Sequence, residues 1–125
     1  MIVYMSIIGN TRKLVQKLQS DSLELTAANS ADLRIEKPYL LIAPTYGKGS
    51  TEPLRAMLDN EQNLAHCRGI IGAGNRNFAR GFCHTAKSLS RSYDLPLLHL
   101  MELQGSSHDV EIINKEIEKI GTTNA

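Results

Sequence analysis

The run of five apolar residues at 39–43, with Pro38 before it and Pro44 after it, constrains the fold more than any other feature of this 125-residue chain. An apolar run of this length, without polar alternation, is typical of a strand that is buried on both faces. Such strands occur in parallel sheets, because the helices that connect parallel strands pack on the faces of the sheet. The run therefore predicts an inner strand of a parallel sheet.

Apolar runs and helical patterns alternate along the rest of the chain. Strands are predicted at 2–5, 23–26, 39–43, 70–73 and 97–103, and helices at 11–18, from 51 onward with Pro53 in the first turn, at 79–93, and after a turn at 105–107. Five strands and four helices in this order predict an α/β protein with a flavodoxin-like, doubly wound five-stranded parallel sheet and helices on both faces. In that fold the ligand lies beyond the carboxyl ends of the strands, at the loops after strands one, three and four.

Length and composition indicate one domain, predicted at 1–121, followed by a tail at 122–125. With 14 Lys and Arg against 13 Asp and Glu, the charge balance gives no reason to expect a nucleic acid or an anionic membrane as a partner. No apolar run approaches the ~20 residues of a membrane span, and no export signal is evident. Two cysteines suit a reducing compartment, so we expect a cytoplasmic protein.

The loop after the first strand, residues 6–11, reads Ser-Ile-Ile-Gly-Asn-Thr and leads into a helix. Its backbone N–H groups and the positive end of the helix can face one anion. Ser6, Asn10 and Thr11 add side-chain donors, with Thr11 or Asn10 near the helix N-cap, and Gly9 allows close approach of the backbone. Because no residue of this loop is basic, it predicts a phosphate held by neutral hydrogen bonds.

The loop after the third strand contains Thr45, Tyr46, Gly47 and Lys48. Its two glycines, at 47 and 49, allow close approach to a planar ligand, and Tyr46 could lie beside a ring. A glycine-rich turn with an exposed tyrosine is an equally good interpretation of the same residues.

In the loop after the fourth strand, Gly74 is followed by Asn75, Arg76, Asn77 and Phe78. The two amides could bind an imide-like edge such as the pyrimidine side of an isoalloxazine, or could be structural turn residues. Lys48 and Arg76 would border the ligand and favour an anionic form of it, or could be solvated loop residues.

Two residues beyond this loop are also candidates. Phe82 could wall a pocket together with Phe78, or both could belong to the core. Cys83 lies near the start of the predicted long helix, where the helix dipole could make it reactive, although packing against a ring is the stronger interpretation.

Several site classes are excluded. The first loop lacks the Gly-Lys-Ser/Thr ending of a P-loop and the three spaced glycines of a dinucleotide fingerprint. No Cys is followed six residues later by Arg, as in small phosphatases, and no acidic residue closes the first or third strand, as in receiver domains. The four histidines and two cysteines lack metal-ligand spacing, so no metal site is predicted.

Together these residues resemble the NrdI family, the small flavodoxin-like proteins that serve class Ib ribonucleotide reductase. The run at 69–78, which ends in Gly-Asn-Arg-Asn-Phe, carries the resemblance, with support from 8–11, 43–47, 95–97 and 102–106. The sequence departs from the family pattern at Ile7-Ile8, at Lys48 and at Ala79-Arg80.

The resemblance implies bound FMN, with the phosphate at 6–11 and the ring between 45–47 and 75–78. It also implies that the reduced flavin meets dioxygen and provides superoxide to the dimanganese centre of the reductase's small, radical-generating subunit, with electrons from a separate donor. No catalytic residue is assigned. The predicted cofactor-binding residues are Ser6, Ile7, Ile8, Gly9, Asn10, Thr11, Thr45, Tyr46, Gly47, Lys48, Gly74, Asn75, Asn77, Phe78, Phe82 and Cys83. A general flavodoxin-type electron carrier and a flavin-free interaction protein on the same fold are the alternatives.

Overall fold

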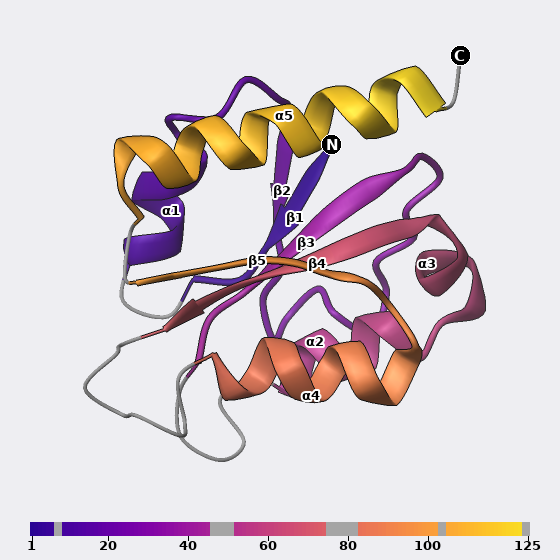
Figure 1. Ribbon diagram of the computed structural model, residues 1–125. Helices are drawn as coiled ribbons and strands as arrows, with labels where there is room; N and C mark the ends of the chain where they lie inside the picture. The colour runs from indigo at the N-terminus through magenta and orange to yellow at the C-terminus, as the bar shows by residue number, and fades with distance from the viewer. Residues whose placement is uncertain (7–8, 46–51, 75–82, 103–104, 124–125) are drawn as a thin grey trace.

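The computed structural model describes residues 1–6, 9–45, 52–74, 83–102 and 105–123 (Figure 1). Within these residues one parallel sheet is formed, with the strand order β2-β1-β3-β4-β5. Its strands are β1 (Ile2–Tyr4), β2 (Ser22–Glu24), β3 (Tyr39–Ala43), β4 (Cys67–Gly74) and β5 (Leu97–Glu102). The strand order reverses between β1 and β3, so the predicted flavodoxin-like class is confirmed.

Helices cover both faces of the sheet (Figure 1). Helix α1 (Asn10–Val15) and helix α5 (Ser107–Thr123) pack on one face. Helices α2 (Glu52–Leu58), α3 (Glu61–His66) and α4 (His84–Tyr93) pack on the other. Each connection from one strand to the next therefore carries a helix or a turn across a face, as parallel pairing requires.

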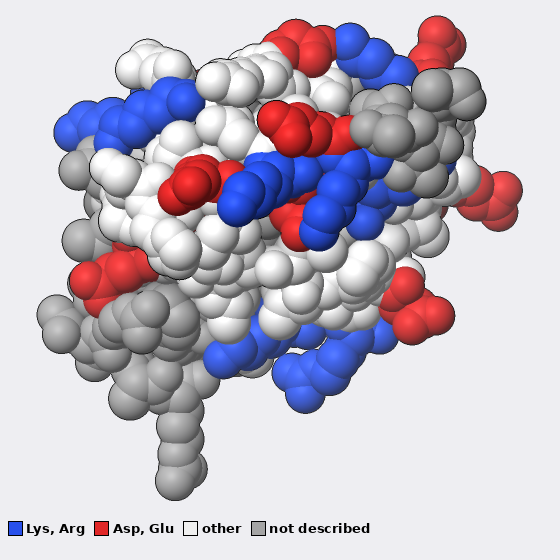
Figure 2. Space-filling view, turned by 45° about the horizontal axis from the view of Figure 1, so that its top comes forward, with Lys and Arg blue, Asp and Glu red and all other residues white. Residues whose placement is uncertain are grey.

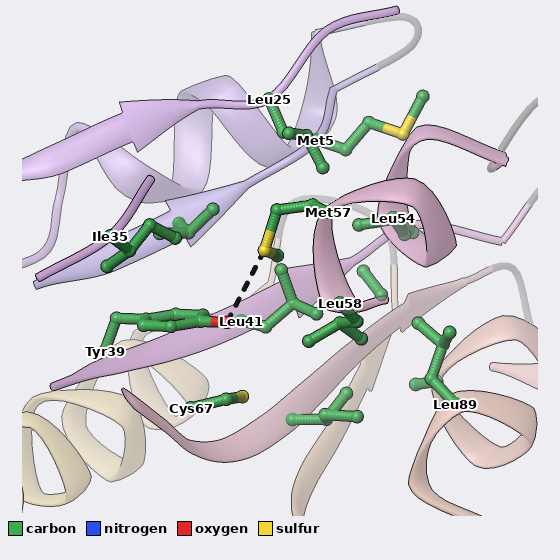
Figure 3. Close-up of a cluster of buried hydrophobic side chains, with 14 residues drawn as sticks. Met5, Leu25, Ile35, Tyr39, Leu41, Leu54, Met57, Leu58, Cys67 and Leu89 are labelled. Carbon is green, nitrogen blue, oxygen red and sulfur yellow. Dashed lines mark hydrogen bonds between the residues drawn. The ribbon is translucent and has the colours of Figure 1, made fainter. Parts of the chain in front are cut away.

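Strand β3 divides the apolar interior into two clusters, because its alternate residues point to opposite faces. Tyr39 and Leu41 join the cluster beneath α2 and α4, and Leu40 and Ile42 join the cluster beneath α1 and α5. Figure 3 shows the first cluster, in which Tyr39 Oη lies 3.5 Å from the Sδ atom of Met57. The prediction of a strand at 39–43, buried on both faces, is confirmed to the residue.

The first helix is shorter than predicted. It spans Asn10–Val15 rather than 11–18. The N–H of Lys17 donates to the carbonyl of Leu14 at 2.9 Å, and that of Leu18 to Val15 at 3.1 Å. These three-residue spacings show that the chain tightens into turns after Val15. Leu18 nevertheless remains buried, which explains why the apolar pattern continued past the helix.

The segment between β3 and β4 holds a helix, α3, that the sequence analysis missed. Asn60 interrupts the helical path after α2 and caps α3, because its side-chain oxygen accepts the N–H of Asn63 at 3.0 Å. Strand β4 also begins earlier than predicted, at Cys67 instead of residue 70, since Cys67 and Gly69 already pair with β3.

The boundaries nearer the C-terminus differ as well. Helix α4 begins at His84 rather than 79, because Cys83 has a φ of 54°, in the left-handed region; residues 79–82 lie outside the described part. Helix α5 continues to Thr123, two residues beyond the end predicted for the domain. In the described ranges no helix is long and apolar enough to span a membrane.

The surface carries both signs of charge. On the face drawn in Figure 2, the Lys and Arg side chains are interspersed with Asp and Glu side chains. This pattern fits the near-neutral composition of the chain and gives that face no extended field of one sign.

Candidate functional site

The hydroxyl of Ser6, which follows β1, contacts backbone groups at the start of α1. Ser6 Oγ accepts the N–H of Gly9 at 3.1 Å and the N–H of Arg12 at 3.3 Å. The residue that precedes the helix is Gly9, so neither Asn10 nor Thr11 is the N-cap that the sequence predicted. Thr11 is buried, whereas Gly9 and Asn10 are half-buried; Ile7 and Ile8 lie outside the described residues.

Gly9 is a position that requires glycine. Its φ of 92° is one that residues with a Cβ rarely adopt. A Cβ built on Gly9 would have no atom within 4 Å, apart from its chain neighbours. The space over this glycine is therefore open, while its backbone is held through the bond to Ser6. This combination leaves room for a ligand above the backbone of Gly9.

A cluster that the sequence analysis missed lies directly beside this loop. The guanidinium of Arg12 makes two bonds to Glu24, from Nε to Oε1 at 3.0 Å and from Nη2 to Oε2 at 2.8 Å. Tyr4 Oη donates to the same Oε1 at 3.0 Å. Tyr4 and Glu24 are register partners in β1 and β2, and Arg12 belongs to the first turn of α1.

This cluster shifts the ionisation of its members. The hydrogen bond from Arg12 is the largest cause that lowers the pKa of Glu24, outweighing the effect of burial. The pKa of Tyr4 is raised, first by burial and then by its bond to the Glu24 carboxylate. The lowered pKa of Glu24 and the raised pKa of Tyr4 favour a charged Glu24 and a protonated Tyr4, which is the state in which all three contacts exist.

The ends of β3 and β4 are tied together at the same edge. Thr45 Oγ1 donates to the carbonyl of Ala73 at 3.0 Å, and the buried Gly74 ends β4. The structure thus places Thr45 and Gly74 beside one another at the carboxyl edge, where the loop after β1 also lies. The other predicted residues of these two loops lie outside the described part: Tyr46, Gly47, Lys48, Asn75, Asn77, Phe78 and Phe82.

Cys83 is fully buried and directly precedes α4. Its Sγ atom lies 3.8 Å from the carbonyl oxygen of Met101, and its Cβ lies 3.1 Å from where a Cβ on Gly72 would be. A thiol with no exposed surface is not accessible to reagents in solution, so the burial of Cys83 speaks against a reactive cysteine. The predicted packing of Cys83 against a ring stays a prediction.

The start of α5 is stabilised by a reciprocal pair of side chains. Asp109 Oδ2 accepts the N–H of Ser106 at 2.7 Å, and Ser106 Oγ accepts the N–H of Asp109 at 3.2 Å. His99 of β5 contacts the same carboxylate, with Nε2 2.6 Å from Oδ1. Among the described residues no group of three or more His, Cys, Asp or Glu side chains is arranged to hold a metal ion.

The comparison with protein families matches residues 2–115 to the family described as NrdI Flavodoxin like. The chain belongs to this family. Curated proteins named Protein NrdI are similar over nearly its full length. The protein from Brucella ovis is 35% identical over 98% of this chain and 95% of its own, and that from Cronobacter sakazakii is 32% identical over 95% and 93%.

A solved structure also supports the fold of this NrdI family member. It is described as a short-chain flavodoxin associated with a non-canonical PDU bacterial microcompartment. The TM-score is 0.68, and the match covers 99% of this chain and 97% of the other at 18% sequence identity. At this identity the likeness shows the fold alone.

Proposed function

We propose that this protein binds FMN at the carboxyl edge of its sheet and acts as the flavoprotein activator of class Ib ribonucleotide reductase. Membership of the NrdI family over residues 2–115 is the observation that carries the proposal. The chemistry supplied by bound, reduced FMN is the conversion of dioxygen to superoxide, with which the reductase's small subunit oxidises its dimanganese centre and forms a tyrosyl radical. A separate electron donor reduces the protein between cycles.

The loop after β1 fits the phosphate end of such a cofactor. The oxygen of the Ser6 hydroxyl accepts the N–H groups of Gly9 and Arg12, so its hydrogen can donate to the phosphate. The N–H groups of Asn10 and Thr11, at the start of α1, have no acceptors within the helix. Gly9 leaves open space above a backbone fixed by its bond to Ser6. Neutral donors of this kind bind a phosphate without a cationic side chain, provided that several converge on it.

The loops after β3 and β4 would hold the ring. The bond from Thr45 to the Ala73 carbonyl keeps the starting points of these two loops together. In this proposal Tyr46, Gly47 and Lys48 lie along one side of the ring, and Asn75, Asn77 and Phe78 along the other. Phe82 and Cys83, which follow the second loop in the sequence, would complete this side of the site.

Flavin titration tests the cofactor assignment. The purified protein, freed of flavin, is titrated with FMN while the quenching of flavin fluorescence is followed. Asn75→Ala and Asn77→Ala should each weaken binding by about 1–3 kcal/mol, because each removes a hydrogen bond to the ring. Asn114→Ala is the matched control, since Asn114 accepts the N–H of Gln19 between α5 and the chain after α1. Unchanged affinity in both loop variants would refute their assignment.

Activation of the reductase tests the function. The manganese-loaded small subunit is mixed with the reduced FMN protein and dioxygen, and the tyrosyl radical is measured by electron paramagnetic resonance. We expect a radical that requires the reduced protein and that is suppressed by superoxide dismutase. Tight FMN binding without any radical would instead favour a general electron carrier. Failure to bind FMN at all would favour a flavin-free interaction protein.

A further inference from the structure

The cluster of Tyr4, Glu24 and Arg12 stands beside the proposed phosphate loop, yet it takes no part in the function described so far. Arg12 is the third residue of α1, and side chains in a helix lean toward its N-terminus. An unrestrained arginine at this position would point toward the loop at 6–11. In the structure its guanidinium is instead bound at both Nε and Nη2 by the Glu24 carboxylate.

The strand order shows on which side of β1 Glu24 holds the Arg12 guanidinium. Strand β2 is the edge strand on one side of β1, and β3 and β4 lie on the other side. A carboxylate on β2 therefore holds the Arg12 guanidinium at the outer edge of the sheet, away from Thr45 and Gly74. The backbone N–H of Arg12 donates to Ser6, and its guanidinium donates to Glu24. The backbone of Arg12 thus contacts the phosphate loop, whereas its charge is directed to β2.

The carboxylate is itself fixed in position. Tyr4 Oη donates to Glu24 Oε1, and Tyr4 is only 8% exposed. Three elements, β1, β2 and α1, thus contribute to one hydrogen-bonded group in which both carboxylate oxygens are used. Two parallel bonds between a guanidinium and a carboxylate also fix their relative orientation, which a single contact does not.

We propose that Glu24 is a specificity-determining residue, which sequesters the Arg12 guanidinium so that the ligand phosphate is bound by neutral donors alone. The proposal rests on the proposed function, because it concerns how the phosphate of FMN is recognised. Glu24 acts on the ligand through Arg12 and touches no part of the cofactor.

Releasing Arg12 is the direct test. In Glu24→Gln the replacement has the same shape and still accepts from Tyr4, but it lacks the charge that holds the guanidinium. FMN should then bind roughly three- to tenfold more tightly in about 0.05 M salt, and the gain should shrink in about 0.5 M salt, where charges are screened. Riboflavin, which lacks the phosphate, should bind equally to both proteins. Glu24→Ala is the second variant should the first fail to fold.

Two further variants locate the effect. In Glu24→Gln/Arg12→Gln the gain in FMN affinity should disappear, because no cation is left to be released. Asp21→Asn is the matched charge control. Asp21 pairs with Lys37 and directly precedes β2, so it lies at the amino end of the strand whose last residue is Glu24. The substitution therefore removes the same charge far from the carboxyl ends of the strands. This control should leave the affinity for FMN unchanged.

The outcomes separate the two proposals. If the parent protein binds FMN but Glu24→Gln does not bind it more tightly, or binds riboflavin more tightly too, the sequestration of Arg12 is refuted and the proposed function stands. If Glu24→Gln/Arg12→Gln binds FMN as tightly as Glu24→Gln does, the released guanidinium is not the cause of the gain and the inference is again wrong. If the parent protein binds no FMN, both proposals fail.

Discussion

At the scale of single residues, Asn63 holds more of the fold together than its place in a six-residue helix suggests. It is fully buried, and its amide nitrogen donates to the carbonyls of Leu33 and Met57 at 2.9 and 3.0 Å. Its side-chain oxygen accepts the N–H of Ile35 at 2.8 Å. One amide thus satisfies three backbone groups from an irregular segment and from α2, and the bonds to Ile35 and Met57 are buried.

Asn63→Ala should destabilise the protein by about 2–4 kcal/mol, because it leaves those three backbone groups unpaired in the interior. Asn60→Ala removes only the helix cap and should cost about 1 kcal/mol. Urea unfolding followed by circular dichroism measures both. Equal costs for the two variants would contradict the role given to the Asn63 side chain.

Gly72 and Gly69 lie on the same strand but should respond differently to an added methyl group. A Cβ on Gly72 would lie 2.7 Å from Cβ of Ala86 and 3.1 Å from Cβ of Cys83, atoms that can move only with their backbone. The three atoms nearest to a Cβ on Gly69 would all belong to the side chain of Leu98, which can rotate. We expect Gly72→Ala to cost about 1–3 kcal/mol in urea unfolding and Gly69→Ala clearly less. A larger cost for Gly69→Ala than for Gly72→Ala would show that α4 can shift more easily than the Leu98 side chain can rotate.

At the scale of elements, the start of α5 depends on an ionised side chain. Burial alone would raise the pKa of Asp109, but hydrogen bonds from His99 and Ser106 outweigh it and bring the pKa below its ordinary value. A lowered pKa in the folded state means that the carboxylate stabilises the fold at all pH values above its unfolded pKa of about 3.9. That stabilisation is lost as the pH falls through the folded-state value.

Asp109→Asn should therefore lower the free energy of unfolding by about 1 kcal/mol at pH 7. The difference from the parent protein should shrink in urea unfolding as the pH falls below the ordinary aspartate value, because protonation of the native carboxyl group then removes its stabilising bonds. Glu111→Gln is the control on the same helix, because Glu111 is exposed and its ion pair with His108 is a long contact of 4.0 Å. A difference that does not change at any pH between 7 and the acid unfolding of the protein would show that charge is not the cause.

The elements also show what the sequence could and could not predict. Strand β3 was predicted to the residue because prolines mark both ends of an uninterrupted apolar run. Helix α3 was missed because it is only six residues long and owes its start to a single asparagine. The first three residues of β4 were missed because Arg68 and Gly69 break the apolar pattern, although the pairing with β3 extends through them.

At the scale of the whole molecule, the sheet order decided which loops share an edge. The order of strands and helices was enough to predict that Ser6, Thr45 and Gly74 would lie at the carboxyl ends of β1, β3 and β4. It could not predict the contact of Arg12 with Glu24, because that contact depends on the register of β1 against β2. Two side chains twelve residues apart meet only once that register is fixed.

The two cysteines offer a measurement on the whole protein, because both are buried and lie near opposite ends of the sheet. A thiol reagent can modify them only when the surrounding structure opens. FMN should slow the modification of Cys83 more than that of Cys67, since Cys83 directly follows the loop that would hold the ring. Peptide mass spectrometry assigns each site, and equal slowing of both would argue against contact between FMN and that loop.

The pairing of Arg12 with Glu24 has a consequence for the ligand's own titration. The second proton of a phosphate monoester is lost near pH 6, which doubles the charge on the group. A nearby cation would prefer the doubly charged form and would make binding tighten as the pH rises through this value. A loop of hydroxyl and backbone donors distinguishes the two forms far less. The affinity for FMN should therefore change little between about pH 5.5 and 7.5, and Glu24→Gln should introduce a dependence that the parent protein lacks.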